Sequence, residues 1–125
     1  MYRLGVSRTF KARHYLVGGD WGDENIEHSH RYRLELILEA DKLDRHGFLV
    51  DIVEVERHLD EIVAEFSGKT LNTLACLNNR NPSIEEFATA LHGLFTHRLA
   101  PFQLETISVT LWEDDFAWTS YRAAV

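Results

Sequence analysis

Strict alternation of side-chain character between His28 and Ala40 constrains the fold of this chain more than any other feature. Successive side chains of a strand point to opposite faces, so the alternation predicts a long β-strand with one buried face. The two histidines at its beginning lie at the end of the core-facing side, partly shielded from water. The core-facing set is His28, His30, Tyr32, Leu34, Leu36 and Leu38, and the opposite, charged set is Arg31, Arg33, Glu35 and Glu39.

Three further strands are predicted from period-two patterns, and a glycine-rich, acidic loop separates the first two strands. The first strand places Phe10, Ala12 and His14 on one face. The face of the third strand is apolar until Glu113, a carboxylate that either lies beyond the buried part or waits for a ligand with N–H donors. The predicted strands cover 2–15, 28–40, 107–113 and 116–122, and the loop covers 17–27.

Two helices are expected between the second and third strands. Apolar residues recur at helical spacing after Asp51, up to a stop near Gly68, and again after Ser83. A glutamate follows each predicted N-cap by three residues, as in a capping box. We therefore expect one α+β domain over residues 1–125, in which a four-stranded antiparallel sheet carries two helices on one face in the order ββααββ. Sheets of several subunits would join edge to edge, which removes exposed edges.

The composition excludes some classes of function. The 125 residues carry a formal net charge of −7, which argues against nucleic acid as a partner because phosphate backbones require a basic face. No apolar run of about 18 residues predicts a membrane span, and the N-terminus resembles no signal peptide, so we expect a cytoplasmic protein. Cys76, the single cysteine, cannot form an internal disulfide and has no activating neighbours between 73 and 79, which predicts a structural role.

His14, His28 and His30 are the candidate metal ligands. Residues two apart on a strand share a face, and a histidine from a neighbouring strand completes a set of three nitrogens. Three imidazoles with the fourth position open suit a catalytic zinc ion. The alternative is that these histidines form ordinary hydrogen bonds, as expected of His46, His58, His92 and His97, which lie in helix-like or turn-like stretches.

Five motifs in order resemble one known family, the 6-pyruvoyl-tetrahydropterin synthases and the related 6-carboxytetrahydropterin synthases of queuosine biosynthesis. The resemblance covers nearly the whole chain. The motifs are Phe10-x-Ala12-x-His14, His28-Ser29-His30, Gly47-Phe48-Leu49-Val50-Asp51, Leu71-Asn72 with Asn81-Pro82-Ser83 and Glu85, and Glu113 near the C-terminus.

The resemblance implies a tunnelling fold (T-fold), with subunits assembled as trimers around a β-barrel and usually paired into hexamers. It also implies Zn²⁺ on His14, His28 and His30, and a pterin substrate whose pyrimidine edge is bound by Glu113. A carboxylate suits that role because it accepts two parallel N–H bonds. Zinc, as a Lewis acid, would polarise oxygens of the substrate side chain.

The chain departs from the family pattern at the proton-transfer positions. Glu24 stands where the family has a cysteine, and Ser67 and Gly68 stand where it has an Asp-His pair. Glu24 could serve as general base if burial or the nearby Asp23 and Glu27 raised its pKa. A subgroup with glutamate at this position is associated with cleaving dihydroneopterin to a hydroxymethyl pterin. The alternative is that Glu24 is one more solvated acid in an acidic loop.

The leading functional hypothesis is a zinc-dependent lyase acting on a reduced pterin, 7,8-dihydroneopterin triphosphate or a close relative. Glu24 would be the base, Glu113 the pterin anchor and the three histidines the metal ligands. A second hypothesis is a pterin-binding protein without the family's activity, because the cysteine, aspartate and histidine positions have changed. A third is a zinc enzyme whose substrate is not a pterin.

Overall fold

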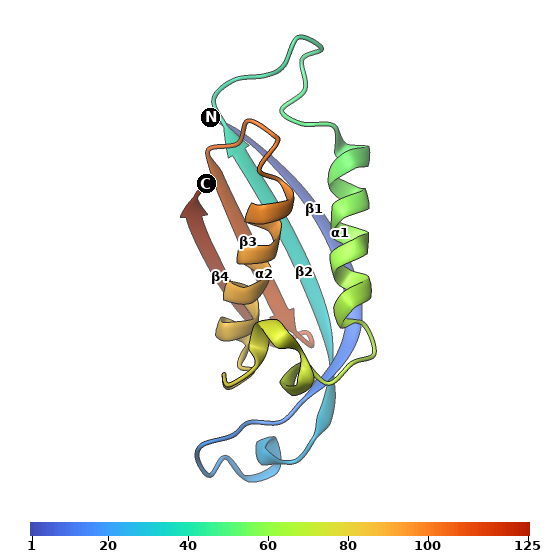
Figure 1. Cartoon of the computed structure of the whole chain (residues 1–125), viewed down its shortest axis with the longest axis vertical. Coiled ribbons are helices and arrows are strands. Elements are labelled where there is room, and N and C mark those ends of the chain that lie inside the picture. The colour runs from blue at the N-terminus through green and yellow to red at the C-terminus, as the bar shows by residue number, and fades with distance from the viewer.

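The computed structural model describes all residues from Met1 to Val125 and consists of one antiparallel sheet covered on one face by two helices (Figure 1). This confirms the predicted fold class and element order. The strands run in the spatial order β1-β2-β3-β4. The elements are β1 (Tyr2–His14), β2 (His28–Ala40), α1 (Ile52–Phe66), α2 (Ile84–Arg98), β3 (Thr106–Glu113) and β4 (Ala117–Ala124).

The alternation predicted for β2 is realised in full. Leu34, Leu36 and Leu38 are completely buried beneath the helices, whereas Glu35 and Ile37 between them lie on the other face. β1 pairs with β2 along its entire length, from Tyr2 opposite Ala40 to His14 opposite His28. Because the register is set by the buried face of each strand, a slip by one residue would expose the whole leucine row.

The helices begin where the capping residues predict, but the capping boxes are only half formed. The Asp51 side chain accepts a hydrogen bond from the backbone N–H of Val53 at 2.9 Å, and Ser83 accepts one from Glu86 at 3.2 Å. The reciprocal bonds are absent because Glu54 and Glu86 pair instead with arginines. The apolar stripes pack on the sheet, as predicted; their buried members are Val55, Leu59, Ile62 and Phe66 of α1, and Phe87, Ala88, Leu91 and Phe95 of α2.

The fourth strand differs slightly from its prediction. It begins at Ala117 and extends to Ala124, because Phe116 belongs to the β3–β4 turn and is 92% exposed. Among the remaining histidines, His92 is buried in α2 and its Nε2 lies 3.0 Å from the carbonyl oxygen of Ile107 on β3, an ordinary structural bond. Neither helix is long and apolar enough to cross a membrane.

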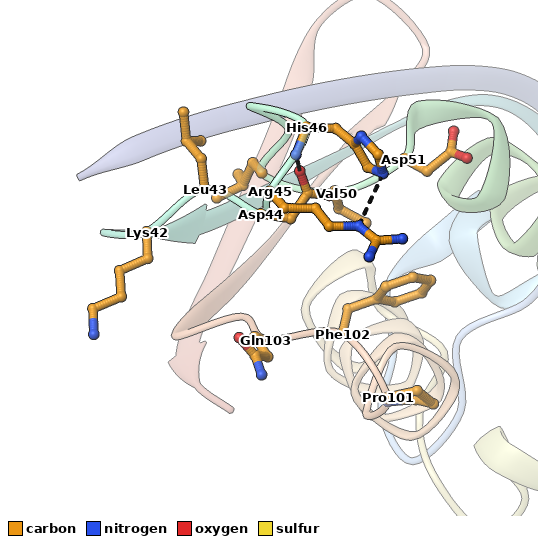
Figure 2. Close-up of a pocket in the computed structure, with 11 residues that line it drawn as sticks. Lys42, Leu43, Asp44, Arg45, His46, Val50, Asp51, Pro101, Phe102 and Gln103 are labelled. Atoms are coloured by element: carbon orange, nitrogen blue, oxygen red, sulfur yellow. Dashed lines mark hydrogen bonds between the residues drawn. The ribbon is translucent and has the colours of Figure 1, made fainter.

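The largest surface hollow, about 580 Å³, lies between the loop that follows β2 and the loop that precedes β3 (Figure 2). Charged side chains such as Lys42 and Arg45 line it, and Arg45 is bonded to His46. This hollow is at the opposite end of the sheet from His14 and His28 (Figure 1). Because it is an open space between loops, and His14, His28 and His30 all lie at the other end of the sheet, it is a poor candidate for the functional site.

Candidate metal centre

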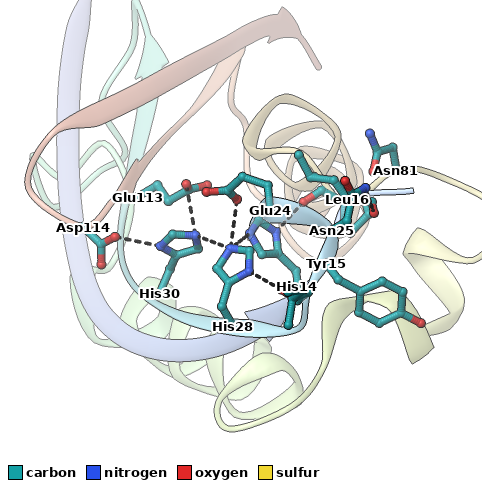
Figure 3. Close-up of polar contacts among 12 residues, drawn as sticks. His14, Tyr15, Leu16, Glu24, Asn25, His28, His30, Asn81, Glu113 and Asp114 are labelled. Carbon is teal, nitrogen blue, oxygen red and sulfur yellow. Dashed lines mark hydrogen bonds and ion pairs between the residues drawn. The ribbon is translucent and has the colours of Figure 1, made fainter. Parts of the chain in front are cut away.

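The strand ends bring every predicted site residue to one place (Figure 3). His14 is the last residue of β1, and His28, the first residue of β2, is its direct partner in the register. His30 follows two residues later on the same face. Glu113 ends β3, and Glu24 reaches the same point from a short 3₁₀ turn, η1 (Gly22–Asn25), within the β1–β2 loop. The cluster therefore depends on strand pairing and on one loop.

The imidazole rings converge through their Nε2 atoms. The Nε2 atom of His28 lies 3.0 Å from that of His14 and 2.9 Å from that of His30. Ligand atoms from these three histidines and Glu24 all lie within 4.8 Å of one another. Nitrogen ligands around a tetrahedral zinc ion, at bonds of about 2.0–2.1 Å, are about 3.3 Å apart, so this spacing is close to that of a metal site.

The other ring nitrogen of each histidine fixes which tautomer is present. The Nδ1 atoms of His14 and His28 lie 2.8 Å and 2.6 Å from the carbonyl oxygens of Pro82 and Ile26. The Nδ1 atom of His30 lies 2.7 Å from Oδ2 of Asp114. These oxygens accept hydrogen bonds, so each Nδ1 carries a proton and each Nε2 is turned toward the centre. Where the rings are neutral, three nitrogen lone pairs meet here and favour a cation between them.

The three imidazole nitrogens are a donor set that fits a zinc ion. Neutral imidazole nitrogens are ordinary ligands of Zn²⁺, and the partner of the second ring nitrogen orients each ligand and raises its basicity. The pKa of His14 is lowered by burial and by the neighbouring His30 and His28, although the bond to Pro82 opposes the shift. A histidine that stays neutral keeps its lone pair available to a metal.

Asp114 is a part of the site that the sequence did not reveal, since it falls in the gap between the third and fourth predicted strands. Its carboxylate accepts from His30 and, at 3.0 Å, from the backbone N–H of Arg31. Burial opposes ionisation, but these two bonds hold the pKa of Asp114 below its ordinary value. The useful signal was its position directly after Glu113, opposite the histidine strand.

Glu113 and Glu24 present two carboxylates beside the histidines, and they lie close to each other in Figure 3. Glu113 Oε1 is 3.2 Å from His30 Nε2, and Glu24 Oε2 is 3.0 Å from His28 Nε2. Burial raises the pKa of the Glu113 carboxyl, and Glu24 and Asp114 add to the effect, against the opposing influence of His30. The Glu113 side chain is 22% exposed, so part of it remains free for a ligand.

The surroundings of Glu24 differ from those expected. Glu27 does not face Glu24, because its two oxygens bind Arg13 Nε and Thr70 Oγ1, each at 3.1 Å. The carboxylate that faces Glu24 is that of Glu113 (Figure 3). The Glu24 side chain is 48% exposed, so burial does not distinguish it from the other acidic residues of the loop. What distinguishes it is its position beside His28.

The departures from the family pattern have structural roles here. Ser67 caps the end of α1, and its N–H donates to Val63 O. Gly68 adopts a φ of +74°, which favours glycine, and its N–H donates to Lys11 O at 2.7 Å. Cys76 packs against the core, and burial raises the pKa of its thiol, in agreement with the predicted structural role. None of these side chains belongs to the histidine cluster.

Comparison with known proteins identifies the relatives. The family model of 6-pyruvoyl tetrahydropterin synthase matches residues 3–124. The synthase of Plasmodium vivax superposes with a TM-score of 0.83 at 13% identity, covering 99% of this chain and 98% of that one. The synthase of Caenorhabditis elegans gives 0.79 at 14% identity, covering 98% and 95%.

The Plasmodium vivax synthase is also represented by two variants in which a catalytic glutamate is replaced by cysteine or by alanine. No curated protein matches the chain by sequence. At such low identities the solved structures support the fold alone, and they agree with the sheet and helices described above. The family model spans almost the whole sequence, so the chain belongs to the 6-pyruvoyl tetrahydropterin synthase family.

Proposed function

We propose that this protein is a zinc-dependent lyase acting on the side chain of a reduced pterin, with 7,8-dihydroneopterin triphosphate or a close relative as substrate. The observation that carries the proposal is the convergence of three imidazole Nε2 atoms whose Nδ1 atoms are all bonded to oxygen acceptors. Family membership supports the pterin and the lyase reaction. Two carboxylates at the same point supply groups for substrate binding and proton transfer.

The zinc ion would be held by His14, His28 and His30. When bound, it would act as a Lewis acid that draws electron density from side-chain oxygens of the substrate. The protein contributes the orientation of the ligands, through the carbonyl oxygens of Pro82 and Ile26 and the carboxylate of Asp114.

Glu24 is the proposed general base, which would take a proton from the pterin side chain. Its carboxylate lies at the histidine cluster, 3.0 Å from His28 Nε2, within reach of any group that binds there. The Plasmodium vivax relative supports a catalytic role for Glu24, because a glutamate is a catalytic residue in that protein of the same fold.

Glu113 is the proposed pterin anchor. The aminopyrimidine edge of a pterin offers two parallel N–H donors, which match the two oxygens of a carboxylate. Glu113 lies at the end of the buried face of β3 with one oxygen toward His30, so a pterin bound to it would extend its side chain over the histidines.

A second candidate is a pterin-binding homologue without turnover. The observation that favours it is the loss of the Asp-His pair, since Ser67 and Gly68 terminate α1 and supply neither a carboxylate nor an imidazole. Cleavage of dihydroneopterin to a hydroxymethyl pterin by Glu24 is a third outcome, and it differs from the first only in the bond that breaks.

We further propose that the protein assembles as a trimer or hexamer around a β-barrel. Apart from the bonds that Lys11 and Arg13 of β1 form with Gly68 and Lys69, the outer edges of β1 and β4 are unpaired in the single chain, and such edges are normally covered or joined. Sedimentation should then give three or six times the 14.5 kDa chain mass. A monomer at micromolar concentration would contradict the barrel.

The deciding experiment is mass spectrometry of products after zinc-loaded protein is mixed with 7,8-dihydroneopterin triphosphate. A pyruvoyl, carboxy or hydroxymethyl pterin establishes the lyase and shows which bond breaks. Unchanged substrate that nevertheless binds would favour the homologue without turnover, and absence of pterin binding would refute both.

The variant Glu24→Gln should reduce turnover at least about 100-fold, which is typical of losing a general base, and should leave zinc bound. Asp23→Asn is the matched control, because it removes the same charge from an exposed neighbour in the same turn. Equal turnover in the two variants would remove Glu24 from the mechanism.

A further inference from the structure

The β1–β2 loop that carries Glu24 has almost no buried side chain to hold it. From Val17 to Glu27 every residue is exposed except Asn25. Gly18 and Gly22 adopt positive φ values. Glycine has more conformational freedom than any other residue, so these turns add little rigidity to the loop. A carboxylate on such a loop needs polar bonds to stay in one place.

Asn25 supplies these bonds through a single side chain. Its Nδ2 donates to the carbonyl oxygens of Leu16 and Gly19, each at 3.0 Å, and its Oδ1 accepts from Trp21 N–H at 2.7 Å. The carboxamide thereby joins both ends of the loop, next to Glu24 in the sequence. Only a carboxamide of this length combines two donors with an acceptor here, because an aspartate would direct an oxygen at two carbonyls.

The segment that Asn25 holds is itself fixed to the rest of the fold. Leu16 N–H donates to Glu24 O at 2.8 Å, so Leu16 is bonded to both Glu24 and Asn25. On either side of it, Tyr15 exchanges two hydrogen bonds with the Asn72 side chain, and Val17 N–H donates to Asn81 Oδ1 at 3.0 Å. Figure 3 shows Asn25, Leu16 and Asn81 together beside Glu24.

We propose that Asn25 is a positioning residue that holds the Glu24 carboxylate against His28, by fixing the β1–β2 loop to Leu16. The inference rests on the proposed role of Glu24 in the metal site. Without these bonds the loop would sample many conformations, and Glu24 would lie beside His28 in only some of them. A displacement of about 1 Å can lower a rate 100-fold, so the loss of Asn25 should be felt at the reacting atoms.

The test compares Asn25→Ala, Glu24→Gln, the double variant and Asn78→Ala in the full chain. Asn78 is an exposed asparagine whose side chain makes no hydrogen bond, so it is the matched control. Asn25→Ala should lower kcat 10- to 100-fold with KM changed less than threefold, and should cause no further loss in the Glu24→Gln background. Equal losses in both backgrounds would show a general effect on folding and overturn the proposal.

A second measurement does not depend on turnover. Protein loaded with Co²⁺ has a visible absorption spectrum that changes with the groups around the metal. Asn25→Ala should shift this spectrum as Glu24→Gln does, and Asn78→Ala should leave it unchanged. If the wild type turns over no pterin but the spectra behave in this way, the proposed function fails and the positioning role stands. A wild-type spectrum in Asn25→Ala overturns the positioning role, whatever the activity.

Discussion

Replacing Asp114 with asparagine should weaken zinc binding about 10-fold. In the protein the Asp114 carboxylate accepts from His30 Nδ1 at 2.7 Å and from Arg31 N–H at 3.0 Å. An asparagine oxygen can still accept from His30, so the change converts a charge-assisted bond into a neutral one, a difference of about 1–2 kcal/mol. The Asp114 side chain is 42% exposed, and solvent screening keeps the effect below the upper end of that range, at about 1.4 kcal/mol, which corresponds to about 10-fold in affinity.

This estimate agrees with the general effect of removing a carboxylate behind a histidine ligand, about 10- to 100-fold in metal affinity. The backbone is not the cause, because Asp114 has a φ of +54° and asparagine tolerates that conformation as well as aspartate does. The assay is competition for zinc with a chelator of known affinity, together with thermal unfolding to verify the fold.

The matched control is Asp115→Asn. Asp115 is the next residue of the same turn, is exposed, and forms no hydrogen bond or ion pair through its side chain. It therefore reports the effect of losing one negative charge from this region. If both variants bind zinc equally well, within about twofold, the bond from His30 to Asp114 contributes nothing to the metal site and the reasoning is refuted.

Two further predictions concern stability. Tyr32→Phe should stabilise the metal-free protein by about 1 kcal/mol in urea unfolding, because the Tyr32 hydroxyl is buried without a hydrogen-bond partner; a clear loss of stability would contradict this. Glu39 is 8% exposed, and its hydrogen bond from Arg122 lowers its pKa. Its contribution is therefore present above the unfolded pKa of about 4.3 and is lost as pH falls through the lower, folded value. Glu39→Gln should destabilise the protein more at pH 7 than at pH 3, and a difference independent of pH would be the contrary result.

Much of the fold could be predicted because its signals are local. The apolar row of β2 lies under the helices as the alternation required, and Asp51 and Ser83 begin their helices as their side chains predicted. The reciprocal capping bonds and the start of β4 were predicted incorrectly. Arginines on neighbouring turns competed for Glu54 and Glu86, and a one- or two-residue shift at a turn leaves the sequence pattern unchanged.

The candidate site was predictable only where strand periodicity determined it. His28 and His30 share a face because they are two residues apart, and that required no tertiary information. The neighbours of Glu24 were not predictable. Glu27 is bound to Arg13 and Thr70, whereas Glu113, far away in the sequence, faces Glu24. The position of a loop is set by bonds to distant backbone, which leave no periodic signal.

The sequence by itself determined the element order, the buried face of each strand, and the chemistry available at the strand ends, because side-chain direction along a strand follows from covalent geometry. Tertiary structure decided which groups meet. The β1–β2 register placed His14 opposite His28, the β3–β4 turn brought Asp114 to His30, and the carbonyl oxygen of Pro82 reached His14 from a segment 68 residues away. These contacts fix the tautomers on which metal binding depends, and they exist only once the chain has folded and the strands have paired.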